Sequence, residues 1–324
     1  MRELTYVRAL NEALVEEMER DPSVFLIGED IGYSGGGVFR VTTGLADRFG
    51  EKRLRETPIS ESAIIGTAVG AAATGLRPVA EIMYMDFITC AMDQVVNQAA
   101  KISFMSGGQV KLPLVIRTPS GMGTREAAQH SQSLEAWFIH APGLKVVMPA
   151  TAYDAKGLLK AAIRDEGPVL FIENRMLYYE KETVPEGEWL VPLGQAQIRR
   201  EGKEVTVVAT AFALSKVLKA AEALASEVSV EVIDPRTLVP LDVGAIVKSV
   251  EKTGRLLVVH ESPARGGFGA EVVRQVVERA FDYLETPPRV LGGASTPIPY
   301  SPPLEDACLP QVQDVVSAVR AFMR

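Results

Sequence analysis

Short apolar runs alternate along the chain with longer stretches in which apolar residues recur every three or four positions. The short runs are typical of buried strands, and the longer stretches indicate helices. In the first half the pattern predicts strands at 24–28, 78–83, 112–117, 144–149 and 168–173. It predicts helices at 61–75, 89–105 and 151–166. Strands alternating with helices favour an α/β fold with a mostly parallel sheet covered on both faces.

The same pattern starts again after a polar stretch that contains proline and glycine. We interpret residues 181–194 as a linker, which places a first domain at 1–180 and a second α/β domain at 195–324. The second domain is predicted to have strands at 204–210, 228–234 and 255–261. Its helices are predicted at 213–227, 242–254 and 266–281, with one more from about Leu309.

Composition and charge narrow the classes of function. The 324 residues carry a net charge of −7, which argues against a nucleic-acid partner and offers no basic surface for anionic lipid. Apolar runs fall short of a membrane span, and residues 1–21 indicate an amphipathic helix instead of a signal peptide. Cys90 and Cys308 lie far apart and form no metal or redox motif. We therefore expect a cytoplasmic protein.

One segment of the first domain combines an acid with an uncharged helix. After Glu61 no charged residue occurs until Arg77, and a helix without a polar face is typical of burial on all sides. Ser60 is suited to cap this helix. An unpaired carboxylate is costly in a dry region, so Glu61 needs a partner that the nearby sequence does not supply. The alternative is that Glu61 only complements the helix dipole.

His130 is the second candidate for chemistry. It lies in GTREAAQHSQSLEAWF, where the chain leaves the strand predicted at 112–117, and α/β proteins bind ligands at that edge of a sheet. The alternative is an ordinary loop histidine. His140 and His260 are assigned to local hydrogen bonds, because the three histidines lack the spacing of a zinc site. Phe87 stands just before a predicted helix and is either core or a platform for a flat ligand.

Several motifs together resemble one family. They are GEDIG, GGVFRVTTGL, TPISESAIIGTAVGAAATGLRPVAE, DQVVNQAAK, AAQHSQSLEAWF, PGLKVVMP, DAKGLLKAAIRD and VIDPRTLVPLD. Over essentially its whole length the chain resembles the β subunit of the E1 component of 2-oxo acid dehydrogenase complexes. The resemblance implies a thiamine-diphosphate pyrimidine-binding domain, then a transketolase C-terminal-like domain. The runs PISESAIIGTAVG and GFGAEVV favour branched-chain members, with the pyruvate dehydrogenase E1 β subunit as the alternative.

The resemblance also implies roles for single residues. Glu61 would pair with N1′ of the aminopyrimidine of the cofactor and promote loss of the proton from thiazolium C2. Cofactor contacts are implied for Glu29, Ile59, Glu61, Met83 and Phe87. Contacts on the substrate side are implied for Tyr84, Asp86 and His130. His130 would orient the substrate or the lipoyl group and move a proton.

Thiamine enzymes usually hold Mg²⁺ and the diphosphate with a GDG motif followed by Asn, and this sequence contains no GDG. In the family that half of the site belongs to the E1 α subunit, so this chain is expected to hold no metal itself. The family assembly is a heterotetramer of two α and two β subunits that docks on a lipoyl-bearing E2 core. The implied reaction is decarboxylation of a 2-oxo acid, such as 3-methyl-2-oxobutanoate, with reductive acylation of the lipoyl group. Single-chain thiamine enzymes are longer than this chain, and a non-catalytic assembly subunit is the remaining alternative.

Overall fold

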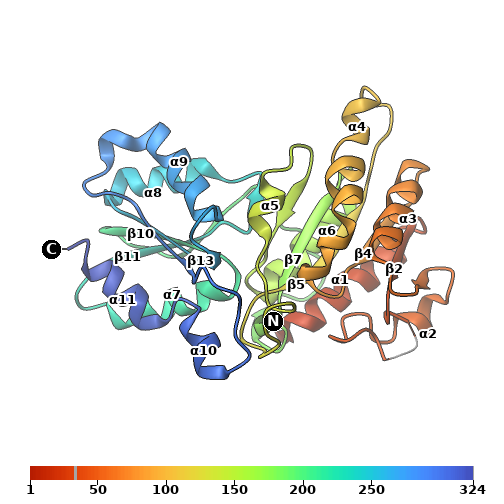
Figure 1. Cartoon of the computed structure of the whole chain (residues 1–324), viewed down its shortest axis with the longest axis horizontal. Helices are drawn as coiled ribbons and strands as arrows, with labels where there is room; N and C mark the ends of the chain where they lie inside the picture. The colour runs from red at the N-terminus through yellow and green to blue at the C-terminus, as the bar shows by residue number, and fades with distance from the viewer. Residues whose placement is uncertain (33–34, 324) are drawn as a thin grey trace. The chain divides into compact units, whose positions relative to one another are not determined.

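A computed structural model describes residues 1–32 and 35–323, which form two compact units. The first unit comprises residues 1–120 and 137–193, and the second unit comprises residues 121–136 and 194–324. Each unit has a sheet with helices packed against it (Figure 1). The short segment 121–136, which lies inside the first predicted domain, thus belongs by its contacts to the second unit. The limits of the two functional domains stay a prediction.

The core of the first unit is a parallel sheet. Its strands, in spatial order, are β6 (Lys145–Val147), β7 (Val169–Asn174), β5 (Val115–Ser120), β4 (Arg77–Glu81), β2 (Val24–Gly28) and β3 (Leu54–Glu56). Each neighbouring pair is parallel, and every residue of β2, β5 and β7 is buried. Burial on both faces accounts for the continuous apolar runs in the sequence. The predicted α/β fold class is confirmed.

The helices of this half of the chain are α1 (Tyr6–Arg20), α2 (Leu45–Phe49), α3 (Glu61–Ala73), α4 (Ile102–Met105), α5 (Glu135–Ile139) and α6 (Ala152–Arg164). The side chains of Thr5 and Thr151 cap α1 and α6 by accepting backbone hydrogen bonds. These caps satisfy N–H groups that have no partner inside the helix. Most predicted helices are found within a few residues of their expected limits.

The single helix predicted over 89–105 is wrong. The chain forms a 3-10 helix at Met85–Ala91, a π-helix at Asp93–Ala99 and only then α4. The Asp93 carboxylate accepts hydrogen bonds from Asn97 at 2.8 Å and from Gln98 at 3.4 Å. A contact five residues ahead fits the wider π turn better than an α-helix.

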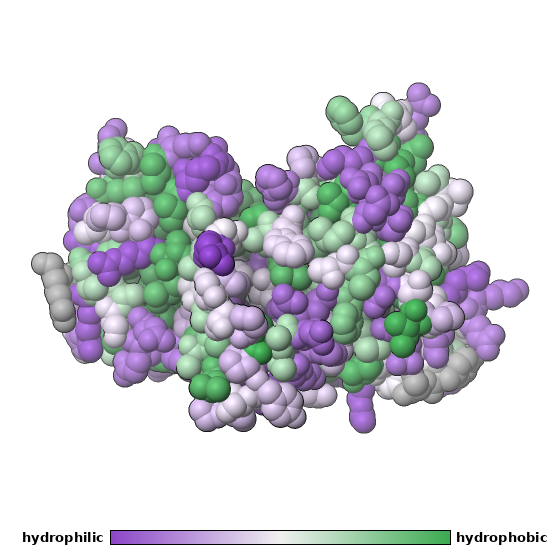
Figure 2. All heavy atoms as spheres, viewed as in Figure 1, coloured by the Kyte–Doolittle hydropathy of each residue, from purple (hydrophilic) through white to green (hydrophobic). Residues whose placement is uncertain are grey.

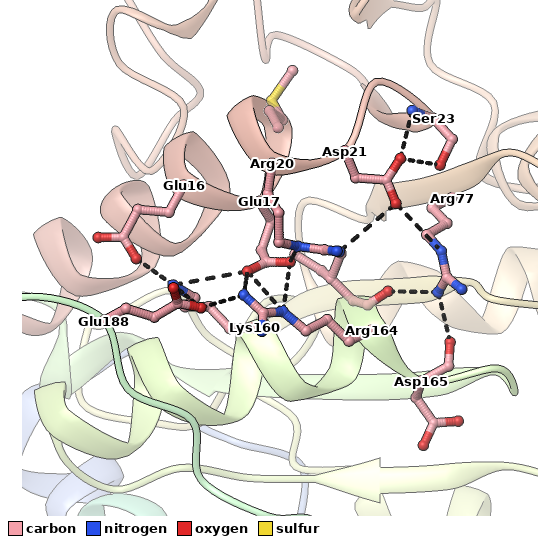
Figure 3. Close-up of polar contacts among 12 residues, drawn as sticks. Glu16, Glu17, Arg20, Asp21, Ser23, Arg77, Lys160, Arg164, Asp165 and Glu188 are labelled. Carbon is pink, nitrogen blue, oxygen red and sulfur yellow. Dashed lines mark hydrogen bonds and ion pairs between the residues drawn. The ribbon is translucent and has the colours of Figure 1, made fainter.

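α1 and α6 lie against each other and share a network of ion pairs (Figure 3). Glu17 of α1 is buried and accepts hydrogen bonds from Arg20 at 2.8 Å and from Arg164 at 2.6 Å. Lys160 of α6 is also buried and pairs with Glu188 at 3.4 Å. Such pairs add little stability over apolar residues, but removing one partner leaves a buried charge and costs about 3–5 kcal/mol.

The stretch predicted as a linker is anchored to the first unit as far as residue 193. β8 (Lys181–Val184) pairs antiparallel with β1 (Arg2–Thr5). Trp189 stacks on Tyr153 with ring centroids 5.3 Å apart and donates a hydrogen bond to the Tyr153 carbonyl at 3.0 Å. The Lys156 ammonium lies 4.5 Å from the centre of the Trp189 ring. The polar composition therefore reflects a surface ribbon and not a free linker.

The second unit has a sheet of its own. Its strands, in spatial order, are β14 (Arg289–Gly293), β13 (Leu256–Pro263), β10 (Val205–Ala209), β11 (Val230–Asp234) and β9 (Gln197–Arg200). Only β9 runs antiparallel to its neighbour among these paired strands. The other elements are α7 (Ala211–Ala223), β12 (Thr237–Val239), α8 (Val243–Thr253), α9 (Phe268–Ala280), α10 (Pro302–Ala307) and α11 (Val312–Arg320). In the described parts of both units, no helix is long and apolar enough to cross a membrane.

His260 explains the glycines at the start of α9. Its ring is fully buried within β13, and Nδ1 lies 2.9 Å from the Ser262 hydroxyl and 3.0 Å from the Ser262 carbonyl. A Cβ at Gly267 would lie 2.7 Å from Cε1 of this ring, and a Cβ at Gly269 would lie 2.9 Å from Nε2. Burial lowers the pKa of His260 to about 4, although the hydrogen bond to Ser262 opposes the shift. The ring is thus a neutral packing element.

Candidate active site

Residues predicted to contact the cofactor gather at the carboxyl edge of the first unit's sheet. Glu29 directly follows β2, Glu61 opens α3 after β3, and residues 83–87 follow β4. Parallel strands end at the same edge, so segments that are separate in sequence meet there. α3 packs against β4 and against the 3-10 helix Met85–Ala91. The topology therefore brings these three segments together.

Glu29 is a buried acid with spare hydrogen-bonding capacity. Glu29 is 8% exposed. Its Oε2 has no hydrogen-bond partner among the described residues. Burial raises the pKa of Glu29, and the charges of Glu61, Asp30 and Glu81 raise it further. Glu29 and Glu61 are therefore close in space. A buried carboxyl of this kind is suited to bind a donor or to exchange a proton.

Glu61 is the first residue of α3 and is partly buried. Ser60 stands at the N-cap position as expected, but its side chain makes no capping hydrogen bond. Within residues 1–32 and 35–323, no hydrogen bond or ion pair involves the Glu61 carboxylate. Ser62 donates a hydrogen bond to the Cys90 carbonyl, which holds the 3-10 helix against the start of α3. The Glu61 carboxylate thus remains available at the positive end of the helix dipole.

A row of aromatic rings runs from Phe87. Phe87 meets Tyr84 edge to face with ring centroids 5.8 Å apart, and Tyr84 meets Phe39 in the same way at 5.5 Å. Phe39 reaches Tyr178 at 5.3 Å, and the guanidinium carbon of Arg175 lies 5.1 Å from the centre of the Tyr84 ring. Phe87 therefore belongs to an ordered aromatic surface. The sequence analysis did not single out Phe39, Tyr178 or Arg175.

Three charged residues on neighbouring strands form a buried network that the sequence analysis also missed. Arg117 of β5 donates to Glu173 of β7 at 2.7 and 2.9 Å, and to Glu81 of β4 at 2.7 Å. Tyr178 donates to Glu173 at 2.8 Å. Burial alone would lower the pKa of Arg117, but the two carboxylates raise it, so the guanidinium stays charged. One feature of the sequence could have revealed this network: each of the three predicted apolar strands contains a single charged residue at or near its end.

The other predicted residues have different surroundings. Ile59 is 80% exposed, whereas Asp86 is buried and its carbonyl accepts a hydrogen bond from Thr89 at 2.8 Å. Met83 is partly buried. His130 is partly buried and lies in the segment 121–136 of the second unit, so its relation to Glu61 stays a prediction. Among the residues that the structure describes, no three His, Cys, Asp or Glu side chains gather as a metal site would require.

In this chain alone α3 is not buried on all sides, and cover of its other face by a partner chain stays a prediction. One face of the helix is buried, with Ile64, Ile65, Ala68, Val69 and Ala72. The other face is exposed and carries small side chains, with Ser62, Ala63, Thr67, Gly70 and Ala73. A Cβ at Gly70 would meet nothing within 4 Å. After Glu61, the apolar sequence of α3 shows that neither face carries a charge. It does not show which chain covers each face.

Two families match consecutive parts of the chain. Residues 2–181 match the family described as the pyrimidine binding domain of transketolase. Residues 194–315 match the family described as the C-terminal domain of transketolase.

Three relatives have similar identity to the chain. The pyruvate dehydrogenase E1 component subunit β of Rhizobium meliloti is 46% identical, over 99% of this chain and 70% of that protein. The mitochondrial pyruvate dehydrogenase E1 component subunit β-2 of Oryza sativa is 46% identical, over 98% of this chain and 86% of that protein. The acetoin:2,6-dichlorophenolindophenol oxidoreductase subunit β of Cupriavidus necator is 46% identical, over 100% of this chain and 98% of that protein.

Solved structures share the fold. An inactive β4 tetramer of a split-gene transketolase matches with a TM-score of 0.80 and 24% identity, over 98% of this chain and 97% of that chain. The transketolase from Leishmania mexicana matches with a TM-score of 0.71 and 17% identity, over 99% of this chain and 46% of that chain. At these identities the likeness supports the fold alone.

Proposed function

Since this chain belongs to the family of E1 β subunits of 2-oxo acid dehydrogenases, we propose that it supplies the pyrimidine side of a thiamine-diphosphate site. There it takes part in decarboxylating a 2-oxo acid and in acylating a lipoyl group. The observation that carries this proposal is the pair Glu29 and Glu61 at the carboxyl edge of a parallel sheet. Sheet edges of this kind are where α/β proteins bind ligands.

The residues at this edge fit an aminopyrimidine ring. The ring needs polar partners for its nitrogen atoms, and Glu61 together with the orphaned Oε2 of Glu29 offers carboxylate oxygens. It also needs a flat apolar surface, which the face of the Phe87 ring offers, with the Tyr84 ring beside it edge to face. We place Met83 and the exposed Ile59 at the rim of the same ring. Tyr84 and Asp86 are assigned to the substrate side.

Thiamine diphosphate, when bound, supplies an electron sink for the decarboxylation of a 2-oxo acid. We expect Glu61 to hold a proton at the pyrimidine nitrogen N1′ and so to fix the protonation state of the ring. Burial and repulsion by Glu61 raise the pKa of Glu29, so a second negative charge beside Glu61 is disfavoured. A carboxyl with a raised pKa beside a second carboxylate suits general acid–base work.

We assign His130 to the step that involves the lipoyl group. An imidazole there would orient the substrate or the lipoyl group and move a proton. His130→Ala should impair reductive acylation of a lipoyl domain while thiamine diphosphate still binds. Unchanged acylation kinetics, or loss of cofactor binding alone, would contradict the assignment.

We propose that an E1 α subunit completes the site in a heterotetramer of two α and two β subunits, which serves a lipoyl-bearing E2 core. The sequence has no GDG motif, so Mg²⁺ and the diphosphate are assigned to that partner. The exposed face of α3 carries only small side chains, which permit close approach of another chain. At the tip of α4, Phe104 and Met105 are 86% and 67% exposed. Figure 2 shows apolar side chains at that tip and a mostly pale surface over α3.

Pyruvate is the substrate that the comparisons support best. The sequence motifs favoured branched-chain 2-oxo acids, but two of the three relatives are named pyruvate dehydrogenase subunits. The third is named for acetoin, which makes acetoin the second candidate. A cytoplasmic location stays a prediction from the sequence.

The test is a reconstitution with a partner chain that carries the GDG and Asn residues. Pyruvate, 3-methyl-2-oxobutanoate, 4-methyl-2-oxopentanoate and acetoin would be compared, with an artificial electron acceptor and with a lipoyl domain. We expect the highest kcat/KM with pyruvate and residual activity with its homologues, because one methylene is worth only about 1–3 kcal/mol. A preference for branched-chain acids would overturn the substrate assignment. Cofactor binding without turnover of any of the four would favour a non-catalytic assembly subunit.

A further inference from the structure

A buried carboxylate of α10 holds the start of the segment that carries His130. Glu305 is fully buried (0% exposed). Its Oε1 accepts a hydrogen bond from the Gly123 N–H at 2.8 Å, and its Oε2 accepts one from Nη1 of Arg125 at 2.9 Å. Both oxygens of one buried acid are thus committed to segment 121–136.

Arg125 has further contacts with the same helix. It donates a hydrogen bond to the Pro302 carbonyl at 3.0 Å and pairs with Asp306 at 2.8 Å. Hydrogen bonds between charged groups are short and directional. Together with Glu305 they fix both the backbone and the side chain at the start of the segment.

The backbone that these contacts hold is in an uncommon conformation. The φ angle is +96° at Gly121, +112° at Gly123, +63° at Arg125 and +61° at Ala127. Residues with a Cβ disfavour the left-handed region, so Arg125 and Ala127 keep it only where surrounding contacts enforce it. The His130 N–H then donates to the Ala127 carbonyl at 3.4 Å. The strained turn therefore leads directly to His130.

The other end of the segment is buried. Ser131, Ser133 and Glu135 are all buried, and burial raises the pKa of Glu135, while a contact with Ser262 of β13 opposes the rise. His130 lies between the two ends and is only partly buried. The contacts of Glu305 therefore hold the segment on the N-terminal side of His130.

We infer that Glu305 is a positioning residue that fixes His130 for transfer to the lipoyl group; this inference rests on the proposed function of His130. Glu305 acts through Gly123 and Arg125 and is not assigned to touch substrate or cofactor. Replacing its carboxylate by an amide would leave one of the two donors, Gly123 or Arg125, without an acceptor. The turn at 123–127 could then relax and let His130 move.

The test uses Glu305→Gln in the reconstituted complex. The new amide places a donor opposite either Gly123 or Arg125, so one of the two contacts is lost. We expect kcat/KM for the lipoyl domain to fall about tenfold or more, as for other misplaced groups. Thiamine diphosphate affinity and the thermal midpoint should stay close to those of the wild type. Amide hydrogen exchange across 121–136 should become about tenfold faster.

Two further variants sharpen the test. Glu227→Gln removes an exposed carboxylate that pairs with Arg320 at 2.7 Å in the same unit, and it should change neither acylation nor exchange. Arg125→Gln removes one of the two contacts of Glu305 and also the contacts of Arg125 with Pro302 and Asp306. It should shift acylation and exchange in the same direction as Glu305→Gln and by at least as large a factor.

The double variant separates a positioning role from a general structural one. With His130→Ala already present, Glu305→Gln should lower acylation no further, because it acts through that histidine. Additive losses would overturn the inference, as would unchanged exchange across 121–136 in Glu305→Gln. If His130→Ala acylates normally, the proposed role of His130 fails. The exchange measurement then still decides whether Glu305 holds the segment.

Discussion

Burial and the charge of Glu61 together raise the pKa of Glu29 at the carboxyl edge of the first unit's sheet. The two acids follow β2 and β3, which are neighbouring parallel strands. The charge of Glu61 therefore disfavours ionisation of Glu29. A carboxyl in such surroundings keeps its proton to a higher pH than an isolated acid does.

Glu61→Gln should lower decarboxylation with an artificial electron acceptor by about 10²-fold, because a proton-transfer partner is lost. The rate would be measured at saturating pyruvate in the complex with the α subunit. Glu19→Gln is the control, since Glu19 is an exposed acid of the same unit that pairs with Arg48. Turnover near the wild-type rate in Glu61→Gln would exclude the proposed role of Glu61.

Two helical glycines should respond in opposite ways to alanine. Gly70→Ala should stabilise the isolated chain by up to about 1 kcal/mol, because alanine favours helix and its Cβ would meet nothing. Gly157→Ala in α6 should destabilise the chain by about 1–3 kcal/mol. Its Cβ would lie 2.5 Å from a methyl group of Val191 and 3.0 Å from Cδ1 of Trp189. Urea unfolding of both variants measures the two signs, which must differ.

The exposed face of α3 can be tested with the same Gly70→Ala variant. If an α subunit packs closely against this face, the added methyl group should weaken binding of that subunit in a calorimetric titration. Gly244→Ala in α8 is the control, because it adds a methyl group to an exposed helix of the second unit. Equal affinity of both variants for the α subunit would place the interface elsewhere.

Stability should fall as acid approaches the pKa of His260. In the folded chain the pKa of His260 is lowered to about 4, whereas a histidine in an unfolded chain has a pKa of about 6.5. Between these values the unfolded chain binds a proton that the folded chain does not, so stability decreases as pH falls through this window. The loss from this group between about pH 7.5 and pH 4.5 is about 2–3 kcal/mol.

His260→Gln removes this titration. Urea unfolding at both pH values should show that the variant loses less stability on acidification than the wild type does. The comparison cancels the other titrating groups, including Glu29 and Glu135, since both proteins contain them. An identical pH dependence would show that the pKa of His260 does not change on folding.

Glu17→Ala should destabilise the first unit by about 3–5 kcal/mol, because it leaves Arg164 without its buried partner. Glu19→Ala, two residues further along on the exposed side of α1, should stay within about 0.5 kcal/mol of the wild type. Thermal unfolding at two salt concentrations would measure both effects. Comparable losses of stability in the two variants would mean that the buried ion pairs in Figure 3 contribute no more than exposed ones.

The sequence predicted the strands best where both faces of the strand are buried. Runs such as 24–28 and 168–173 predict strands because both faces of those strands are covered, and the order of elements then places Glu29 and Glu61 at one edge. β1 and β8 were missed because each is four residues long and has only one buried residue. The π-helix at Asp93–Ala99 was missed because the apolar period of a short π segment hardly differs from that of an α-helix.

The candidate site was only partly predictable for a related reason. Arg117, Glu81 and Glu173 interact across three strands, and a pattern that follows apolar residues along the chain does not register such pairs. The sequence predicted that α3 has no charged face, but it could not show which molecule covers each face, because composition does not identify the covering molecule. Nothing in the local sequence of 121–136 indicates that its contacts lie with the second unit.

The contact between Gly123 and Glu305 has a consequence for synthesis of the protein. Their separation of 182 residues corresponds to a delay of roughly ten to forty seconds at ordinary translation rates. During that time the growing chain holds 121–136 without the acid that fixes it. The His130 turn must therefore be among the later parts to reach its final shape, and a nascent chain halted before α10 should expose it to protease.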